Sequence, residues 1–140
     1  MNREIKFRGQ RKDTKEWVYG FFIQDATSKT VYIENYVGLE FSGSNAYWEV
    51  IPETVGQFTG LKDKNGKEIY EEDIIRMSTE YESAEKIDLV RFLNGGFVVE
   101  WDNQFAGGEA DSTTIGWAIE EGVIIEIIGN IHENSKLIHP

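Results

Sequence analysis

Three consecutive acids, Glu71, Glu72 and Asp73, lie between the apolar pairs Ile69-Tyr70 and Ile74-Ile75. Carboxylates are the ligands that hard cations prefer, so these acids are candidate metal ligands. No His and no second group of acids is assigned near them. We therefore favour a tight turn that enters a strand, in which Asp73 accepts hydrogen bonds from backbone N–H groups. The sequence predicts no cofactor and no metal here.

The other candidate chemical groups are equally isolated. His132 is followed by Glu133, but neighbours on a strand point to opposite faces, and His139 is the penultimate residue. Asp63-x-Asn65 resembles the start of a calcium loop, yet its Gly falls at the fourth position and not the sixth. The chain has no cysteine, no nucleophile elbow and no Gly-Lys-Ser/Thr phosphate loop. We predict no catalytic residues and no enzyme activity.

The acids follow the strongest turn signal in the chain, Asn65-Gly66. A two-residue hairpin turn of type I′ requires positive φ at both central residues, which Asn tolerates and Gly adopts at no cost. We expect this turn between apolar strand positions at Leu61 and Ile69. Upstream, Pro52-Glu53-Thr54 predicts a short helical turn, because Pro suits the first helical position.

Alternation of apolar and polar residues predicts strands elsewhere. We expect an N-terminal hairpin from Ile5–Arg8 and Trp17–Ile23, whose Phe7, Trp17, Tyr19 and Phe21 share a face in the core. Residues 87–101 predict a second hairpin around Asn94-Gly95-Gly96. Residues 102–114 predict a long loop. Residues 115–121 favour a strand or irregular structure over a short helix capped by Asp111 or Ser112. Residues 123–131 predict a central strand, followed by a loosely held tail.

These elements predict a mainly β fold with little helix. It consists of an antiparallel N-terminal hairpin lobe and a small, barrel-like C-terminal lobe. We place the boundary between residues 1–50 and 51–140, although a single continuous domain fits the same pattern.

The stretch from Ile51 to Ile75 resembles the signature of the YopX family of phage and prophage proteins. The segments Ile5–Arg8 and Trp17–Gly20 are similar to the family's opening, and Ile127–Asn134 is similar to its closing strand. The resemblance implies a mainly β fold and brings no activity. One position departs: the family usually has Gly between the acids of E-G-D, so Glu72 puts in question any role that requires a bare backbone there. The residues that we assign to a structural signature are Pro52, Gly56, Gly60, Asn65, Gly66, Tyr70, Asp73, Gly129 and Asn130.

Charge is distributed unevenly along the 140 residues. The net charge is −11, but residues 1–17 hold six basic residues against three acids, a balance of +3, which leaves −14 for residues 18–140. A strongly acidic chain disfavours general nucleic-acid binding. No apolar run reaches the roughly 20 residues of a membrane helix, and the N-terminus lacks a signal peptide. We therefore expect a cytoplasmic protein in a bacterial host cell.

Three functions fit these observations. The first is a non-catalytic β module that self-associates or binds a protein partner, and we expect a homo-oligomer. The second is an acidic mimic of nucleic acid that binds a host DNA- or RNA-binding protein. The third is nucleic-acid contact through the basic N-terminal hairpin, whose candidate interaction residues are Arg8, Arg11, Lys12 and Lys15.

Overall fold

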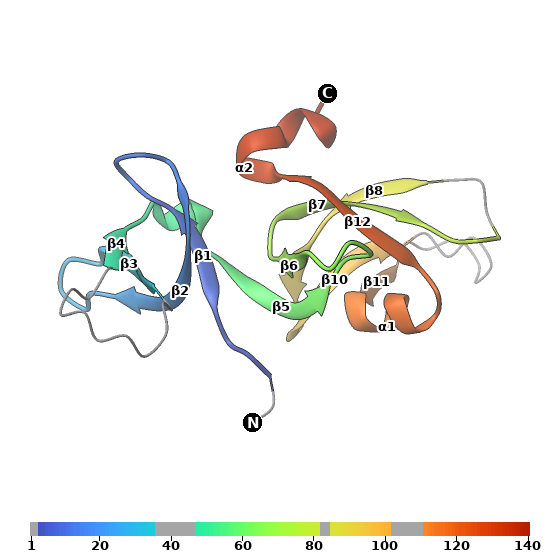
Figure 1. The fold of residues 1–140 in the computed structure, drawn as a ribbon, viewed down its shortest axis with the longest axis horizontal. Coiled ribbons are helices and arrows are strands. Elements are labelled where there is room, and N and C mark those ends of the chain that lie inside the picture. Colours follow the sequence, from blue (N-terminus) through green and yellow to red (C-terminus); the bar gives the residue numbers. More distant parts are fainter. Residues whose placement is uncertain (1–2, 36–46, 82–84, 102–110) are drawn as a thin grey trace. The chain divides into compact units, whose positions relative to one another are not determined.

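The structure is a computed structural model that describes residues 3–35, 47–81, 85–101 and 111–140. The chain forms two compact units, residues 1–60 and 61–140 (Figure 1). Strand β5 (Gly56–Lys62) spans the division. The predicted boundary lies ten residues earlier, and whether the lobes are separate folding domains stays a prediction. As expected, the fold is mostly antiparallel β.

The N-terminal unit is built on a meander. Its strands are β1 (Phe7–Gln10), β2 (Trp17–Gln24), β3 (Val31–Asn35) and β4 (Tyr47–Glu49). Each pairs with the next in antiparallel fashion, and β1 also pairs with the start of β5. The predicted helical turn is present as the 3₁₀ helix η1 (Pro52–Thr54), with Pro at its start. A bridge between Arg11 and Val50 brings the chain after β4 back to the end of β1.

The register of this sheet corrects the predicted core. Phe7 lies opposite Gly20, and Gly9 lies opposite Val18, so Phe7 shares a face with Val18. That face forms the core from Val18, Val31, Ile33 and Val50, with Phe7, Trp48 and Val55 against it. Tyr19 and Phe21 lie on the other face and are 44% and 47% exposed. The prediction that Phe7, Trp17, Tyr19 and Phe21 share a buried face is wrong, because an aromatic period of 2 does not identify which face is covered.

The C-terminal unit contains two open three-stranded sheets, with the strand orders β11-β10-β9 and β12-β7-β8. A hydrophobic core lies within this unit, and Ile69, Ile75, Met77, Val99 and Ile115 are fully buried in it. A barrel-like closure of this lobe is not confirmed. Strand β6 (Glu68–Tyr70) is outside these two sheets and pairs with β5. The strands of the two sheets are β7 (Asp73–Ser78), β8 (Lys86–Leu89), β9 (Arg91–Leu93), β10 (Gly96–Trp101), β11 (Asp111–Thr114) and β12 (Ile124–Asn130).

Three short helices complete this unit: α1 (Ile115–Glu120), α2 (Ile131–Asn134) and η2 (Ser135–Leu137). The expected strand or irregular structure over residues 115–121 is wrong. Thr114 caps α1, because its Oγ1 accepts a hydrogen bond from the backbone N–H of Trp117. The tail, which we predicted without secondary structure, forms α2 and η2 as far as Leu137. The predicted loop over residues 102–114 is wrong at its end, because Asp111–Thr114 form strand β11, and its part at residues 102–110 lies outside the described residues. None of the helices described is long and apolar enough to cross a membrane.

Strand β12 is an edge strand of its sheet and not the predicted central one. The side of β12 that faces away from β7 forms hydrogen bonds with the β5–β6 loop. Lys64 N–H donates to the carbonyl of Ile125, and Ile127 N–H donates to the Asp63 carboxylate. A polar loop therefore takes the place of a neighbouring strand, which explains how an apolar strand is tolerated at an edge.

Candidate functional site

The Asn65-Gly66 turn is built around the buried carboxylate of Asp63. Its Oδ1 accepts from the N–H groups of Asn65 and Lys67, both at 2.9 Å, and its Oδ2 accepts from Ile127 N–H at 3.0 Å. Gly66 has φ +79°, whereas Asn65 is not among the residues with positive φ. Gly66 N–H bonds the carbonyl of Asp63, and Asp63 N–H bonds the carbonyl of Lys67. This pattern is a type I turn followed by a Gly bulge, so the predicted type I′ turn is wrong.

The Asp63 carboxylate therefore acts as a hydrogen-bond acceptor for the backbone. Burial would raise the pKa of its carboxyl, but the three backbone N–H donors and the nearby charge of Lys67 hold that pKa below its ordinary value. An ionised carboxylate with this set of donors fixes the loop against β12. Within the described residues, no group of three or more His, Asp or Glu side chains is arranged to hold a metal ion.

The acidic triplet also forms a turn, and Asp73 has the role predicted for it. Its Oδ2 accepts from Tyr70 N–H at 2.8 Å, and Asp73 and Tyr70 are each 2% exposed. Glu72 has φ +69°, a backbone conformation that favours Gly. Its N–H donates to Val90 and its carbonyl accepts from Ile131 N–H. The turn thus connects strand β7 to two other segments of its unit.

A contact that the sequence analysis missed lies at this turn. The Glu72 carboxylate Oε2 meets His132 Nε2 at 2.5 Å, across sixty positions of sequence. His132 belongs to α2 and not to a strand, so the expected opposition of His132 and Glu133 across a strand does not apply. Glu72 was the one departure from the family's pattern, and that departure was the signal for this pair. The pair joins the turn to the first turn of α2.

The remaining signature residues also form structure. Asn130 caps α2, because its Oδ1 accepts from the N–H groups of His132 and Glu133 at 3.0 Å each. At Gly129 a Cβ atom would lie 2.5 Å from Oδ1 of Asn134, so a side chain there would displace the cap region. Pro52 opens η1, and Gly56 and Gly60 lie in β5. Their assignment to a structural signature stays a prediction, since no variant has tested it.

The four basic candidates of the N-terminal hairpin have partners within their own unit. The Arg8 guanidinium is buried over the Trp17 ring at 4.6 Å. Arg11 makes a two-point contact with Asp13, at 3.0 and 2.8 Å, which lowers the pKa of the Asp13 carboxyl. Lys12 Nζ lies 3.3 Å from Glu49, and Lys15 Nζ bonds the carbonyl of Lys12. The structure brings these residues together on one hairpin but does not leave them as a group of unopposed charges.

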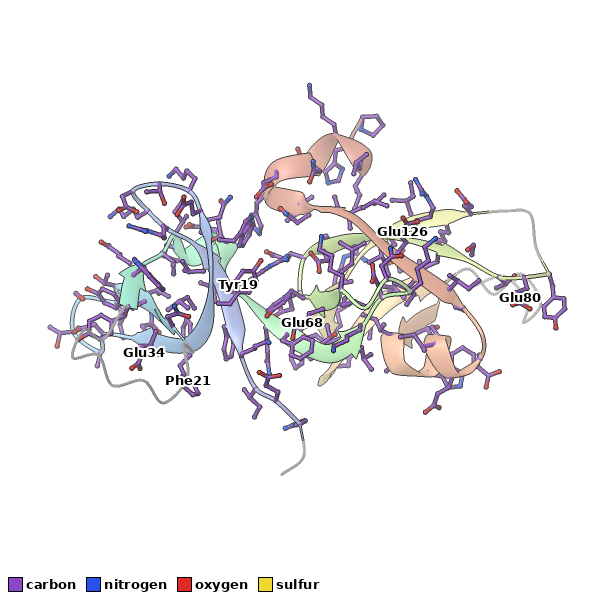
Figure 2. The ribbon with its side chains drawn as sticks, viewed as in Figure 1. Tyr19, Phe21, Glu34, Glu68, Glu80 and Glu126 are labelled. Carbon is purple, nitrogen blue, oxygen red and sulfur yellow. The ribbon has the colours of Figure 1, made fainter. Side chains whose placement is uncertain are left out.

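The feature of this unit that stands out is the sheet face opposite its core. Tyr19 and Phe21 of β2 lie on this face with Arg8, and the pairing of Phe21 with Glu34 and of Glu34 with Tyr47 extends it to β4. Figure 2 labels Tyr19, Phe21 and Glu34 in this unit. We call it the outer aromatic face, and its residues are Arg8, Gln10, Trp17, Tyr19, Phe21, Ile23, Tyr32, Glu34, Tyr47 and Glu49.

The model of the protein family described as "YopX protein" matches residues 6–139 of this chain. The chain belongs to the YopX family. This match extends over the N-terminal sheet, the acidic turn and the α2 cap alike, so the family covers both units.

Individual proteins are also similar to this chain. The SPbeta prophage-derived uncharacterized protein YopX of Bacillus subtilis is 30% identical over 73 residues, which are 52% of this chain and 52% of that protein. The match thus spans about half the length of this curated relative. The crystal structure of B. subtilis YopX superposes with a TM-score of 0.61 at 19% identity and covers 94% of this chain and 96% of that one. The crystal structure of protein EF1440 from Enterococcus faecalis gives 0.56 at 22% identity, covering 98% and 99%. At these identities the structures show a shared fold.

Proposed function

We propose that this YopX protein is a non-catalytic protein-binding module that acts through its outer aromatic face. The observation that carries this proposal is the exposure of Tyr19, Phe21 and Tyr47 on one face of one sheet. Grouped exposed aromatic side chains mark interaction sites, and Tyr, Phe and Trp are enriched in protein interfaces because they bury a large area at low entropic cost.

The partner is a protein, either a second copy of the chain or a protein of the host or phage. The prophage origin of the B. subtilis relative supports a phage or prophage role in the cytoplasm of a bacterial host. Apolar contact must supply most of the affinity, because exposed ion pairs contribute only about 0–1 kcal/mol each. For the same reason, the charge difference along the chain is a weak source of self-association.

The two nucleic-acid hypotheses draw less support from the contacts. Arg8, Arg11 and Lys12 are stacked or ion-paired within their unit, so phosphate binding would have to break those contacts. Residues 61–140 hold seven basic residues against seventeen acids, a balance of −10, while residues 1–60 hold seven against eight, a balance of −1. Several of those seventeen acids stabilise the fold. Asp63, Asp73 and Asp88 are buried and accept backbone N–H groups, so they do not line a surface as phosphates would.

The experiment compares the parent with the double variant Tyr19→Ser/Phe21→Ser in two assays. Light scattering at micromolar concentration measures self-association against the chain mass of 16.1 kDa. Affinity capture from phage-infected host cells, read by mass spectrometry, measures binding to other proteins. We expect the parent to show an oligomer or a reproducible partner, and the double variant to lose it.

The control is the variant Trp117→Ser/Ile119→Ser, which removes two exposed apolar side chains from α1 of the other unit. It should leave the association unchanged. An association that survives loss of Tyr19 and Phe21, but not loss of Trp117 and Ile119, would place binding elsewhere. A parent that stays at 16.1 kDa and captures no protein would contradict the proposed function.

A further inference from the structure

One end of the outer aromatic face is hollowed. A depression of about 390 Å³ is lined by Ile23, Asp25, Tyr32 and Tyr47. These residues come from β2, from the turn after it, and from β3 and β4. The two tyrosine rings meet edge to face with centroids 6.4 Å apart. An edge-to-face pair leaves ring faces open to a further group, and Tyr47 is exposed.

Two carboxylates lie in or near this depression. Asp25 lies at one side, where its Oδ1 accepts from the N–H groups of Thr27 and Ser28 at 2.8 Å each. These bonds lower the pKa of the Asp25 carboxyl, so it stays ionised at neutral pH. Glu34 does not line the depression, but it lies on the same face, two positions from Tyr32 and directly opposite Tyr47 in the β3–β4 register. Within the described residues, no Lys or Arg forms an ion pair with Asp25 or Glu34.

We propose that this depression, which we call the tyrosine pocket, binds a cationic side chain, an arginine guanidinium or a lysine ammonium, from a basic segment of another protein. Tyrosine faces attract cations through the ring quadrupole, and two unpaired carboxylates beside them add charge complementarity. The apolar wall at Ile23 suits the aliphatic stem that carries the charge. The inference rests on the proposed protein-binding function and names the chemistry of the partner.

Charge favours a different protein over a second copy. Each chain carries a net charge of −11, so two copies repel each other at long range, whereas a basic partner is attracted. Lys12 Nζ already lies 3.3 Å from Glu49, and Lys29, in the same turn as Asp25, forms no ion pair with Asp25 within the described residues. The carboxylates at the pocket are therefore left for an incoming group.

The test uses the full chain and two synthetic peptides. The first is an unstructured Gly-Ser peptide with three arginines, and the second is the same peptide with citrulline at those positions, which removes the charge but keeps the shape. Amide chemical shifts recorded by NMR during titration locate the site and give the affinity. We expect the arginine peptide to shift residues 23–25, 32–34 and 47, and the citrulline peptide to bind more weakly.

Three variants examine the contributions separately. Tyr47→Ser should weaken arginine-peptide binding by about two- to fivefold, the size of an exposed cation–π contact. Glu34→Gln should weaken it by up to about fivefold, the size of an exposed ion pair. Glu53→Gln removes the same charge from the exposed start of η1 and should leave the affinity unchanged.

The outcomes separate this inference from the proposed function. An equal loss of peptide affinity in Glu34→Gln and Glu53→Gln would indicate general electrostatic attraction and contradict the pocket. Chemical-shift changes confined to the acidic C-terminal unit would do the same. Equal binding of both peptides would also overturn it. If the parent captures a protein through Tyr19 and Phe21 while the arginine peptide does not bind, the proposed function stands and the tyrosine pocket fails. Light scattering that shows a dimer abolished by Tyr47→Ser would make a second copy the occupant and contradict the basic partner.

Discussion

Two Asn-Gly pairs close hairpins in the C-terminal unit, and they do so in different ways. Asn94 and Gly95 both have positive φ, 51° and 82°, and join β9 to β10 with Leu93 opposite Gly96. This is the type I′ arrangement. At Asn65-Gly66 only Gly66 has positive φ. The same dipeptide therefore specifies a hairpin, but it does not specify which turn the hairpin contains.

The difference comes from the residue two positions before the Asn. Asp63 places a carboxylate under the loop and accepts the N–H groups of Asn65 and Lys67, which favours a type I turn. Phe92 lies two positions before Asn94 and its side chain has no acceptor, so there the intrinsic preference of Asn-Gly decides. The lesson is that a buried acid can override a local turn preference when it also binds a distant strand, as Asp63 does at Ile127.

The largest expected effect follows from removing that acid. Asp63→Ala leaves three backbone N–H groups without their acceptor, and we expect it to cost about 2–4 kcal/mol of unfolding free energy. Chemical denaturation of both proteins measures this. The control is Asp25→Ala, which removes an exposed turn aspartate with two backbone donors and should cost much less. Equal losses in the two variants would mean that the link from Asp63 to β12 contributes nothing.

Valine at either turn glycine should be the next largest effect. Gly66→Val and Gly95→Val each force a β-branched residue to positive φ, at a cost of about 1–3 kcal/mol. Gly96→Val is the matched control, because a Cβ there has only an ordinary contact, 3.7 Å from Thr114 Cγ2. A parent-like melting temperature for Gly66→Val would contradict the bulge that we describe.

The two asparagines offer the most direct comparison. Asn94→Val places a β-branched residue at φ 51° and should cost about 1–2 kcal/mol, whereas Asn65→Val, without positive φ, should cost about 0.5 kcal/mol. Thermal unfolding of the two variants side by side gives the difference. Equal destabilisation would remove the distinction between the turns.

A third left-handed position lies outside any Asn-Gly pair. Glu72→Ala and Glu72→Gly both remove the contact with His132, but only Gly also relieves the positive φ. We expect the Gly variant to be more stable than the Ala variant by about 1 kcal/mol. If Ala proves as stable as Gly, the backbone at Glu72 is not strained, and the Gly that the family usually has here needs another reason.

The smallest expected effect is a pH dependence of the unfolding free energy, caused by Asp63 at the Asn65-Gly66 turn. The pKa of Asp63 is lower in the folded chain than in the unfolded chain, so its contribution is complete above the unfolded value of about 4 and is lost as the pH falls through the folded value. Asp63→Asn should therefore lose less stability than the parent as the pH falls below about 4. Parallel acid unfolding curves would contradict this.

The sequence alone determined the fold class, because period-2 patterns and turn residues are local signals that act within a few positions. It determined the η1 turn through Pro52 and the role of Asp73, whose acceptor reaches only three residues back. The resemblance to the YopX family, carried by the Ile51–Ile75 stretch, was also readable from the residues, and the family match confirms it.

Only the tertiary structure decided which faces are covered and where distant groups meet. The aromatic residues of β2 fit a core or a surface equally well by periodicity, and the register with β1 placed Tyr19 and Phe21 outside. The Asp63 contact with Ile127 and the Glu72 contact with His132 span more than fifty positions each. No local pattern encodes such contacts, because they depend on how strands far apart in the sequence come together. The tyrosine pocket has the same origin, since its walls come from three strands and a turn whose proximity is set by sheet pairing.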